Sequence, residues 1–405
     1  MADKKRRTWV RFRHRVATGA LRALLGPVIR WRYGADIEGA DPFRHGPQLI
    51  LYNHQTPCDQ FFLALSFRRP LYYLATEDIF SKGWLSAALR YLVAPIPIAK
   101  DTTDFSAIQA MVQVAREGGS IAVAPEGNRT FSGKTEHMSP AIVPLARALR
   151  LPIALYRIEG GYGVQPRWSD GIRRGRMRAY VAQVIDPEEY AAITDESLLS
   201  LIRQGLYVNE AAADGRFLSD RRAEYLERLV YVCPFCGLSR FESSGNEIVC
   251  LRCRRAVRYG EDKRLAGVGF SFPFPFVNDW YEYQQRFVNQ LDPSAYLNEP
   301  LYQDGARVLE VILYRRKNLL GKHAALRLYG DRITVDVGAD TAWSLPFADI
   351  TGMAVIGRNR LNVYIGGRAY QFQGDKRFNA VKFLHLYHRH KNATKGNGHG
   401  EFLGL

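Results

Sequence analysis

The segment Gln48–Asp59, which has the sequence QLILYNHQTPCD, decides the fold of the first half of the chain. It begins with an apolar run of the kind that forms a strand buried on both faces of a sheet. Polar residues follow where we expect a turn into a helix over residues 59–67. His54 stands at this turn, and the carboxylate of Asp59 can reach its ring if the chain folds back. A histidine held in this way can take a proton near neutral pH.

The same segment also fits an ordinary helix start. Thr56 would be the N-cap, Pro57 would take the first helical position, and Asp59 would lie in the first turn, where the helix dipole favours an acid. The two interpretations are compatible, because a helix N-terminus beside His54 would help to hold developing negative charge. The segment alone leaves both open.

Between residues 45 and 190, short apolar runs alternate with helical patterns, which is typical of an α/β sheet flanked by helices. Helices are expected over 59–67, 82–92, 103–117 and 139–149, and two more over 195–210 and 219–230. The expected strands are Gln48–Asn53, Leu71–Thr76, Ala94–Ala99, Ser120–Ala124, Pro152–Ile158 and Met177–Ile185.

A second polar turn, PEGNRT over residues 125–130, follows the small-residue strand Ser120–Ala124. Gly127 permits a close approach of the backbone to a ligand, and Arg129 offers a planar fork that suits two phosphate oxygens. Taken alone, a strand that ends in a turn with solvated charges is the commoner explanation.

Together these segments resemble the glycerolipid acyltransferase family, typified by bacterial 1-acylglycerol-3-phosphate acyltransferase. The resemblance rests on the His-x4-Asp motif and on a Pro-Glu-Gly-x-Arg turn whose Glu126 lies 72 residues after His54. Ordered blocks support it: ATEDIF at 75–80, APIPIAKD at 94–101 and LPIAL at 151–155. The match covers roughly residues 45–165. Lys100 departs from the pattern, because the family has an arginine there.

The resemblance implies O-acyl transfer from a thioester without a catalytic metal. His54 would deprotonate the acceptor hydroxyl, Asp59 would orient His54, and the hydroxyl would attack acyl-CoA or acyl-carrier protein. The implied acceptor is 1-acylglycerol 3-phosphate, giving phosphatidate, while another lysophospholipid, glycerol 3-phosphate or a glycolipid stays open. The residues expected to bind the substrate are Glu126, Gly127, Arg129, Lys100 and Asn53.

The chain is strongly basic, with 56 Lys and Arg against 40 Asp and Glu. Residues 1–34 hold ten of the basic residues and one acid, Asp3. Trp9, Phe12 and Trp31 recur at helical spacing, which predicts an amphipathic helix in the surface of an anionic membrane, with most arginines on its other side. A core-packing helix with a solvated basic face is the alternative.

No apolar run is long enough for a membrane-spanning helix, and none has the pattern of a signal peptide. We therefore expect a peripheral protein on the cytoplasmic face of the cell membrane.

Four of the five cysteines form two pairs, Cys233-x2-Cys236 and Cys250-x2-Cys253, with thirteen residues between the pairs. This spacing predicts a zinc ribbon, in which four thiolates hold a structural Zn²⁺. Arginines near the cysteines also suit a different class of protein, a zinc-ribbon nucleic-acid-binding protein. That class leaves the histidine motif without a role, so nucleic acid is not the expected partner.

The last third of the chain has a different pattern. Residues 307–374 contain seven short strand patterns, and a helix is expected over 377–390, which together predict a small pleckstrin-homology-like barrel. The expected division of the chain is a basic docking segment 1–34, an acyltransferase domain 35–228, a zinc ribbon 229–262, an aromatic linker 263–302, the barrel domain 303–392 and a tail 393–405.

Overall fold

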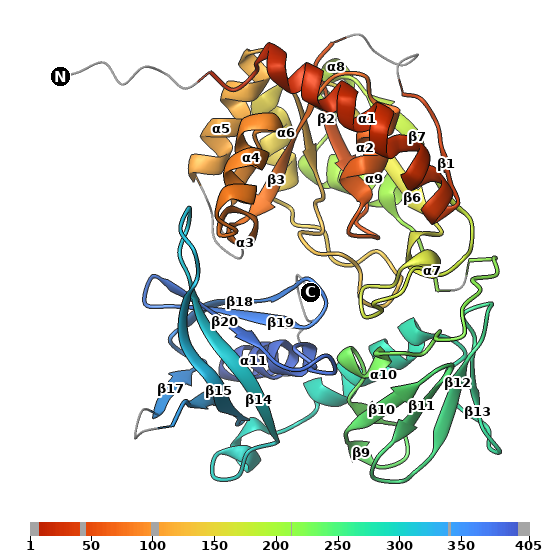
Figure 1. The fold of residues 1–405 in the computed structure, drawn as a ribbon, viewed down its shortest axis with the longest axis vertical. Coiled ribbons are helices and arrows are strands. Elements are labelled where there is room, and N and C mark those ends of the chain that lie inside the picture. The colour runs from red at the N-terminus through yellow and green to blue at the C-terminus, as the bar shows by residue number, and fades with distance from the viewer. Residues whose placement is uncertain (1–7, 41–45, 99–104, 212, 339–341, 396–405) are drawn as a thin grey trace.

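The computed structural model describes residues 8–40, 46–98, 105–211, 213–338 and 342–395. In Figure 1 an α/β half lies above two antiparallel sheets, one formed by the C-terminal strands and the other by the cysteine-containing segment. Lys100, the basic residues before Thr8 and the end of the expected tail lie outside the described residues.

The α/β half is built on a seven-stranded sheet of order β1-β7-β6-β2-β5-β3-β4. Every neighbouring pair is parallel except β6 and β7. All six expected strands are present, and β1 is an addition. The strands are β1 Ala35–Ile37, β2 Leu49–Tyr52, β3 Leu71–Thr76, β4 Ile96–Ile98, β5 Ser120–Val123, β6 Ile153–Glu159 and β7 Met177–Ile185.

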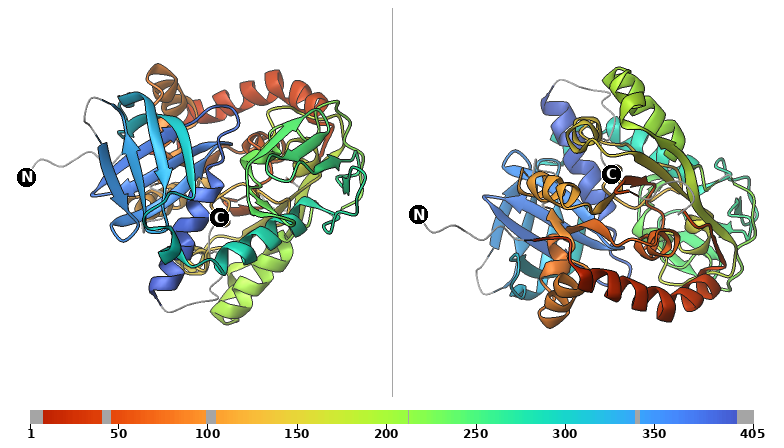
Figure 2. Two further views of the ribbon diagram at one scale, coloured as in Figure 1. Left: turned by 90° about the horizontal axis from the view of Figure 1, so that it is seen from below. Right: turned by 90° about the horizontal axis from the view of Figure 1, so that it is seen from above.

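Helices cover both faces of this sheet (Figures 1 and 2). They are α1 Phe12–Tyr33, α2 Asp59–Ser66, α3 Glu77–Phe80, α4 Trp84–Leu92, α5 Phe105–Arg116, α6 Ile142–Leu149, α7 Gly161–Val164, α8 Pro187–Ala191 and α9 Asp195–Leu206. The prediction of a helix over 219–230 is wrong, because only the 3₁₀ turn Leu226–Arg228 forms there. Tyr225 has a φ of +70°, and the buried Arg228 binds Asp170, so tertiary contacts override the helical pattern.

Helix α1 forms as expected, but its faces differ from the expectation. Trp9, just before the helix, is buried, and its backbone N–H donates to the carboxylate of Glu117 at 2.8 Å. Two arginines expected on a free basic face turn to the protein: Arg22 donates to the carbonyl of Ala64 at 2.9 Å, and Arg30 to that of Ile37 at 3.2 Å. No helix among the described residues is long and apolar enough to cross a membrane.

The cysteine-containing segment folds into short antiparallel strands that continue into a helix. The strands are β8 Val232–Cys233, β9 Gly237–Leu238, β10 Phe241–Ser244, β11 Glu247–Cys250, β12 Ala256–Tyr259 and β13 Leu265–Gly267, and the helix is α10 Val277–Asn289. Trp280 of α10 is buried and donates from its indole nitrogen to the carbonyl of Val232 at 2.8 Å. The stretch expected as an aromatic linker is therefore part of the core.

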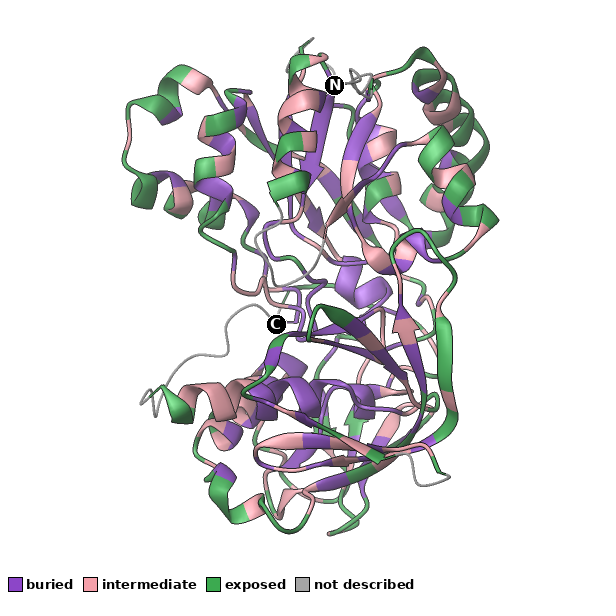
Figure 3. Ribbon diagram, turned by 90° about the vertical axis from the view of Figure 1, so that its left-hand side faces the viewer, coloured by how far each residue is buried: buried purple, intermediate pink, exposed green. Residues whose placement is uncertain are grey.

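The C-terminal part is a seven-stranded antiparallel half-barrel with a closing helix, in agreement with the strand pattern. Its order is β17-β16-β15-β14-β20-β19-β18. A single buried core joins this sheet, α10 and the cysteine segment. Figure 3 shows that buried residues run through both the α/β half and the C-terminal part. The elements are β14 Tyr302–Val311, β15 Asn318–Leu328, β16 Arg332–Asp336, β17 Ala342–Pro346, β18 Ile350–Ile356, β19 Arg360–Ile365, β20 Arg368–Gln373 and α11 Val381–Thr394.

Candidate active site

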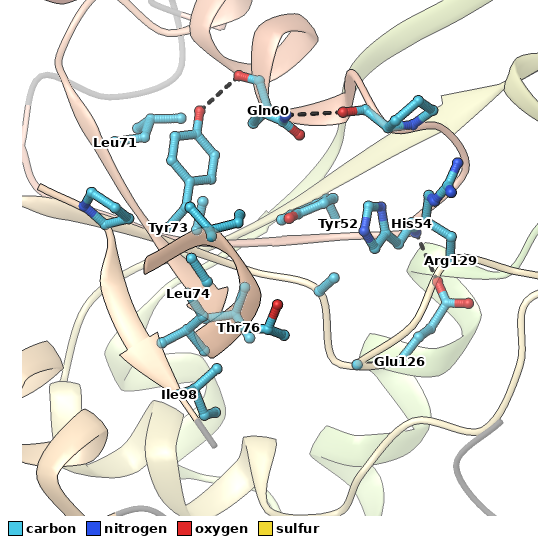
Figure 4. A pocket seen from close by; sticks show the side chains of 18 of the residues that line it. Tyr52, His54, Gln60, Leu71, Tyr73, Leu74, Thr76, Ile98, Glu126 and Arg129 are labelled. Carbon is cyan, nitrogen blue, oxygen red and sulfur yellow. Dashed lines mark hydrogen bonds between the residues drawn. The ribbon is translucent and has the colours of Figure 1, made fainter. Parts of the chain in front are cut away.

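A pocket of about 1100 Å³ opens where β2, β3, β4 and β5 end, which is where open α/β sheets generally bind ligands. Its inner part is apolar and is lined by side chains of α1, α2, α4, α5 and α6. Its mouth carries His54, Glu126 and Arg129, which lie beside one another (Figure 4). An apolar chain with a charged head matches this division.

The structure brings His54 and Asp59 together. The carboxylate of Asp59 accepts a hydrogen bond from Nδ1 of His54 at 2.7 Å, from the N–H groups of Gln55 and Thr56, and from the Thr56 hydroxyl. Asp59 is fully buried, so this cage fixes the ion and the ring that it holds. The arrangement leaves Nε2 of His54 as the nitrogen available to a ligand in the pocket.

The protonation of His54 suits a proton acceptor. Burial lowers the pKa of its imidazole below the usual value of 6.5, Asp59 opposes this shift, and the charges of Arg129 and Arg167 reinforce it. The net direction is downward, so the ring is neutral at pH 7 and can accept a proton.

The helix after this turn starts later than the cap interpretation requires. Helix α2 begins at Asp59, and its N-cap is Cys58, which makes no side-chain capping bond. Thr56 uses its hydroxyl to bind Asp59 at 2.6 Å rather than to cap the helix. The geometry therefore favours the role of Asp59 as a partner of His54.

The Pro-Glu-Gly-x-Arg turn is tied directly to the histidine turn. Glu126 is buried and accepts from the N–H of His54 at 3.0 Å and from that of Glu136 at 3.2 Å. Burial raises the pKa of Glu126 to about 8, although both N–H donors lower it. The backbone N–H of Thr130 donates to the carbonyl of His54 at 3.0 Å, so hydrogen bonds in both directions hold the two turns together.

Within this turn, Gly127 and Arg129 line the pocket. Gly127 has a φ of +69°, a left-handed conformation that favours glycine. Arg129 is 9% exposed, and its Nη1 has no hydrogen-bond partner among the described residues. Burial, reinforced by the charge of Arg358, lowers the pKa of its guanidinium to about 10. The group stays charged at pH 7, and its free donor is available to an anion.

Asn53 occupies a different place from the one expected of a substrate-binding residue. Its amide is fully buried, donates to the carbonyl of Ile158 at 2.8 Å and accepts from the N–H of Ile158 at 2.7 Å. The side chain joins β2 to β6 and does not line the pocket.

Sequence reasoning missed two parts of the pocket mouth. Arg167 lines it from the loop after α7, and residues 355–357 line it from the end of β18 in the C-terminal sheet. Nothing in the sequence signals that contact, because Arg167 and Gly357 are 190 positions apart.

The four cysteines of the two pairs converge. Their sulfur atoms all lie within 4.8 Å of one another, with Cys233 and Cys253 at 3.7 Å and Cys236 and Cys250 at 3.6 Å. Four thiolates around a tetrahedral metal with bonds of about 2.3 Å would be separated by about 3.8 Å. The cluster thus has the geometry to hold a metal ion.

Two of the arginines near the cysteines make contacts within the protein. Arg252 donates to the carbonyl of Cys236 at 2.8 Å, and Arg258 pairs with Glu247 at 2.8 Å.

Comparison with known proteins finds the following similarities. Residues 34–158 match the Acyltransferase family. The 1-acyl-sn-glycerol-3-phosphate acyltransferase of Bacillus subtilis (strain 168) is 18% identical over 136 residues, which are 34% of this chain and 65% of the relative. The crystal structure of the 1-acyl-sn-glycerophosphate (LPA) acyltransferase from Thermotoga maritima matches with a TM-score of 0.37 and 15% identity, covering 47% of this chain and 90% of that chain.

Within the α/β half, residues 34–158 are therefore similar to an acyltransferase domain. The chain spans about 65% of the length of the curated relative that it matches. The matched residues contain both the histidine turn and the Pro-Glu-Gly-x-Arg turn.

Proposed function

We propose that this enzyme transfers a fatty acyl group from acyl-CoA or acyl-carrier protein to the free hydroxyl of 1-acylglycerol 3-phosphate, giving phosphatidate for phospholipid synthesis. The observation that carries the proposal is the bond of 2.7 Å between His54 and Asp59 at the mouth of an apolar pocket, beside the free donor of Arg129. The relative from Bacillus subtilis is named for the same acceptor.

In the proposed reaction, Nε2 of His54 takes the proton of the acceptor hydroxyl as its oxygen attacks the thioester carbonyl carbon. The new C–O ester bond forms, the C–S bond breaks, and the proton passes from His54 to the departing thiolate. Asp59 holds the imidazole in the tautomer with Nε2 free and stabilises the imidazolium that forms. Arg129 binds the acceptor phosphate, and Gly127 lets the backbone approach it.

An acyl transfer assay with lysophosphatidate tests this function. Both donor types should be offered, and lysophosphatidylglycerol, glycerol 3-phosphate and a glycolipid should serve as competing acceptors. We expect phosphatidate to be the preferred product. Faster transfer to another acceptor would identify that molecule as the substrate in place of lysophosphatidate. No transfer to any of these acceptors would contradict the proposed function.

We further propose that the cysteine segment is a zinc ribbon with Cys233, Cys236, Cys250 and Cys253 as ligands, and that the zinc is structural. Four protein thiolates leave no open position on a tetrahedral ion. Metal analysis should find one zinc per chain in the wild type and a loss in the Cys250→Ser/Cys253→Ser variant. Equal zinc in both proteins would refute the ligand set.

The half-barrel with its closing helix supports assignment to the pleckstrin-homology-like class. In this sheet the four consecutive strands β14 to β17 lie on one side and the three strands β18 to β20 lie on the other. The pairing of β14 with β20 joins the two groups.

We propose a peripheral location on the cytoplasmic face of an anionic membrane, because the substrate and product carry acyl chains. Neighbouring helices α1 and α4 leave large apolar side chains exposed, with Phe12 at 79%, Trp31 at 82% and Trp84 at 77%. Aromatic residues beside arginines are typical of helices that lie in a membrane interface.

Sedimentation with phosphatidylglycerol vesicles tests this location. A Trp31→Ser/Trp84→Ser variant should bind less than the wild type, whereas Tyr207→Ser, at the end of α9, should bind equally. Undiminished binding by the double variant would place the membrane contact elsewhere.

A further inference from the structure

Arg167 is a buried cation in the wall of the pocket. Its side chain is 2% exposed, and its guanidinium lies 3.7 Å from the ring centre of Phe131. No carboxylate of the described residues forms an ion pair with it. It donates instead to three backbone carbonyls, those of Arg129, Val355 and Gly357, at 2.7, 2.7 and 2.9 Å.

These three bonds join two parts of the chain. One carbonyl belongs to the Pro-Glu-Gly-x-Arg turn, and the other two belong to the end of β18 in the C-terminal sheet. Residues 355–357 themselves line the pocket. The C-terminal sheet, which lies outside the family match, therefore forms one wall of the site.

The positive charge at this wall is only partly neutralised. A buried cation without a carboxylate is costly, and carbonyl dipoles and an aromatic face offset the cost only in part. A guanidinium has five N–H donors, and Arg167 uses three of them in these bonds, so two N–H groups of this pocket-lining residue make no hydrogen bond to the described residues. Arg358, next to Gly357, shares Asp170 with Arg228 and so leaves a further net positive charge nearby.

We infer that Arg167 and the β18–β19 turn complete the acceptor site, and that Arg167 with Arg129 selects acceptors whose head is a phosphate monoester. This inference rests on the proposed acyl transfer to a lysophospholipid. A monoester carries a charge of about −1.5 to −2 at pH 7, whereas a phosphodiester carries one negative charge. Two buried cations favour the more highly charged head, because a charge interaction is stronger where solvent screening is weak.

The test compares kcat/KM for two acceptors with the same acyl chain, lysophosphatidate as the monoester and lysophosphatidylglycerol as the diester. Arg167→Gln removes the charge, so we expect the monoester-to-diester ratio to fall about tenfold, the equivalent of about 1.4 kcal/mol. Arg167→Lys keeps the charge but loses the fork, so it should lower kcat/KM for both acceptors and keep a ratio within about threefold of wild type. An Arg167 with a purely structural role would lower kcat/KM for both acceptors equally in both variants, and that result would overturn the inference.

Arg167 is buried, so melting curves must show that both variants fold. If neither folds, Arg358→Gln decides, because its side chain is about one-third exposed. Its ratio should fall about threefold, a smaller change because the charge is more screened. Arg368→Gln, at the opposite end of β19 and β20, is the matched control with an unchanged ratio.

An unchanged ratio in a folded Arg358→Gln would overturn the inference. If the wild type transfers acyl groups and the variants keep its monoester-to-diester ratio, the inference is contradicted and the proposed function is not. A wild type that acylates no lysophospholipid contradicts the proposed function instead.

Discussion

The C-terminal sheet meets the α/β half at two places, which differ in whether their buried charges are paired. At the first, the tip of the β14–β15 hairpin reaches α3, where the buried Asp78 pairs with Lys317, with Arg360 at 3.3 Å and with the amide of Gln371 at 3.2 Å. At the second, beside the pocket, Arg129 and Arg167 have no carboxylate within ion-pair distance among the described residues.

The presence or absence of a counterion for a buried charge distinguishes a structural contact from a ligand-binding one. A buried charge with its counterion in place stabilises the contact between two surfaces, whereas a buried cation without one implies that an anion arrives from outside. Changes at Asp78 should therefore alter stability, and changes at the pocket should alter turnover or acceptor binding.

The largest effect is expected at the partner of the base. Asp59→Asn should lower kcat about 10³–10⁴-fold, because an amide cannot stabilise the imidazolium and favours the wrong tautomer. Melting curves should change much less than turnover, since the amide keeps part of the hydrogen-bond cage. A variant with near-normal kcat would show that Asp59 only shapes the turn.

Asp78→Asn should act in the opposite way, with little change in KM and a loss of about 2–3 kcal/mol in the free energy of unfolding. The loss is below that of a fully buried pair, because Arg360 is 30% exposed. Denaturant titration measures it. Asp336→Asn, which breaks a more exposed pair with Arg327, is the control and should cost under about 1 kcal/mol.

The same contact should depend on pH. Burial alone would raise the pKa of Asp78, but Arg360, Lys317 and Gln371 outweigh burial and hold it below its usual value. For a carboxyl with a lowered pKa, the stabilisation is present at neutral pH and is lost as pH falls through the folded-state pKa, below about 4. Asp78→Asn should therefore remove part of the acid sensitivity of the wild type.

Arg129→Ala should raise the KM for the acceptor about 10–100-fold, and Arg129→Lys should recover only part of this loss, because an ammonium cannot reproduce the planar fork. The KM for the acyl donor should stay close to that of the wild type. An unaltered acceptor KM in the alanine variant would make Arg129 structural.

The smallest effect is a shift in the pH profile. His54 must be neutral to accept a proton, and its pKa lies below 6.5, so kcat/KM should fall on the acid side only below that pH. The charge of Arg129 contributes to the lowered pKa. The acid limb of the pH profile of Arg129→Ala should therefore move to higher pH. An unchanged acid limb would show that the charge of Arg129 does not affect the pKa of His54.

Much of the fold was predictable because local patterns agree with tertiary packing. Strands β3 and β7 match their expected bounds to the residue, and the contact of His54 with Asp59 was expected from the histidine turn taken together with the Pro-Glu-Gly-x-Arg turn. The failures have long-range causes. Trp9 looked free for a membrane but packs in the core, and the helix expected at 219–230 is displaced by the contacts of Arg228.

Arg167 shows the limit most clearly. It lies beyond the residues that match the family, in a loop with no motif, and two of its three partners, Val355 and Gly357, are 188 and 190 positions away. Only the folded arrangement places this cation beside Arg129, so no spacing rule could have found it.

The most direct test of the central claim is the turnover of purified His54→Ala with lysophosphatidate and a thioester donor. His54 lies on an accessible turn, with its side chain 24% exposed, so the variant should keep the wild-type fold and melting temperature. The account predicts that transfer falls at least about 10³-fold in this folded protein. Near-normal transfer by folded His54→Ala would contradict it.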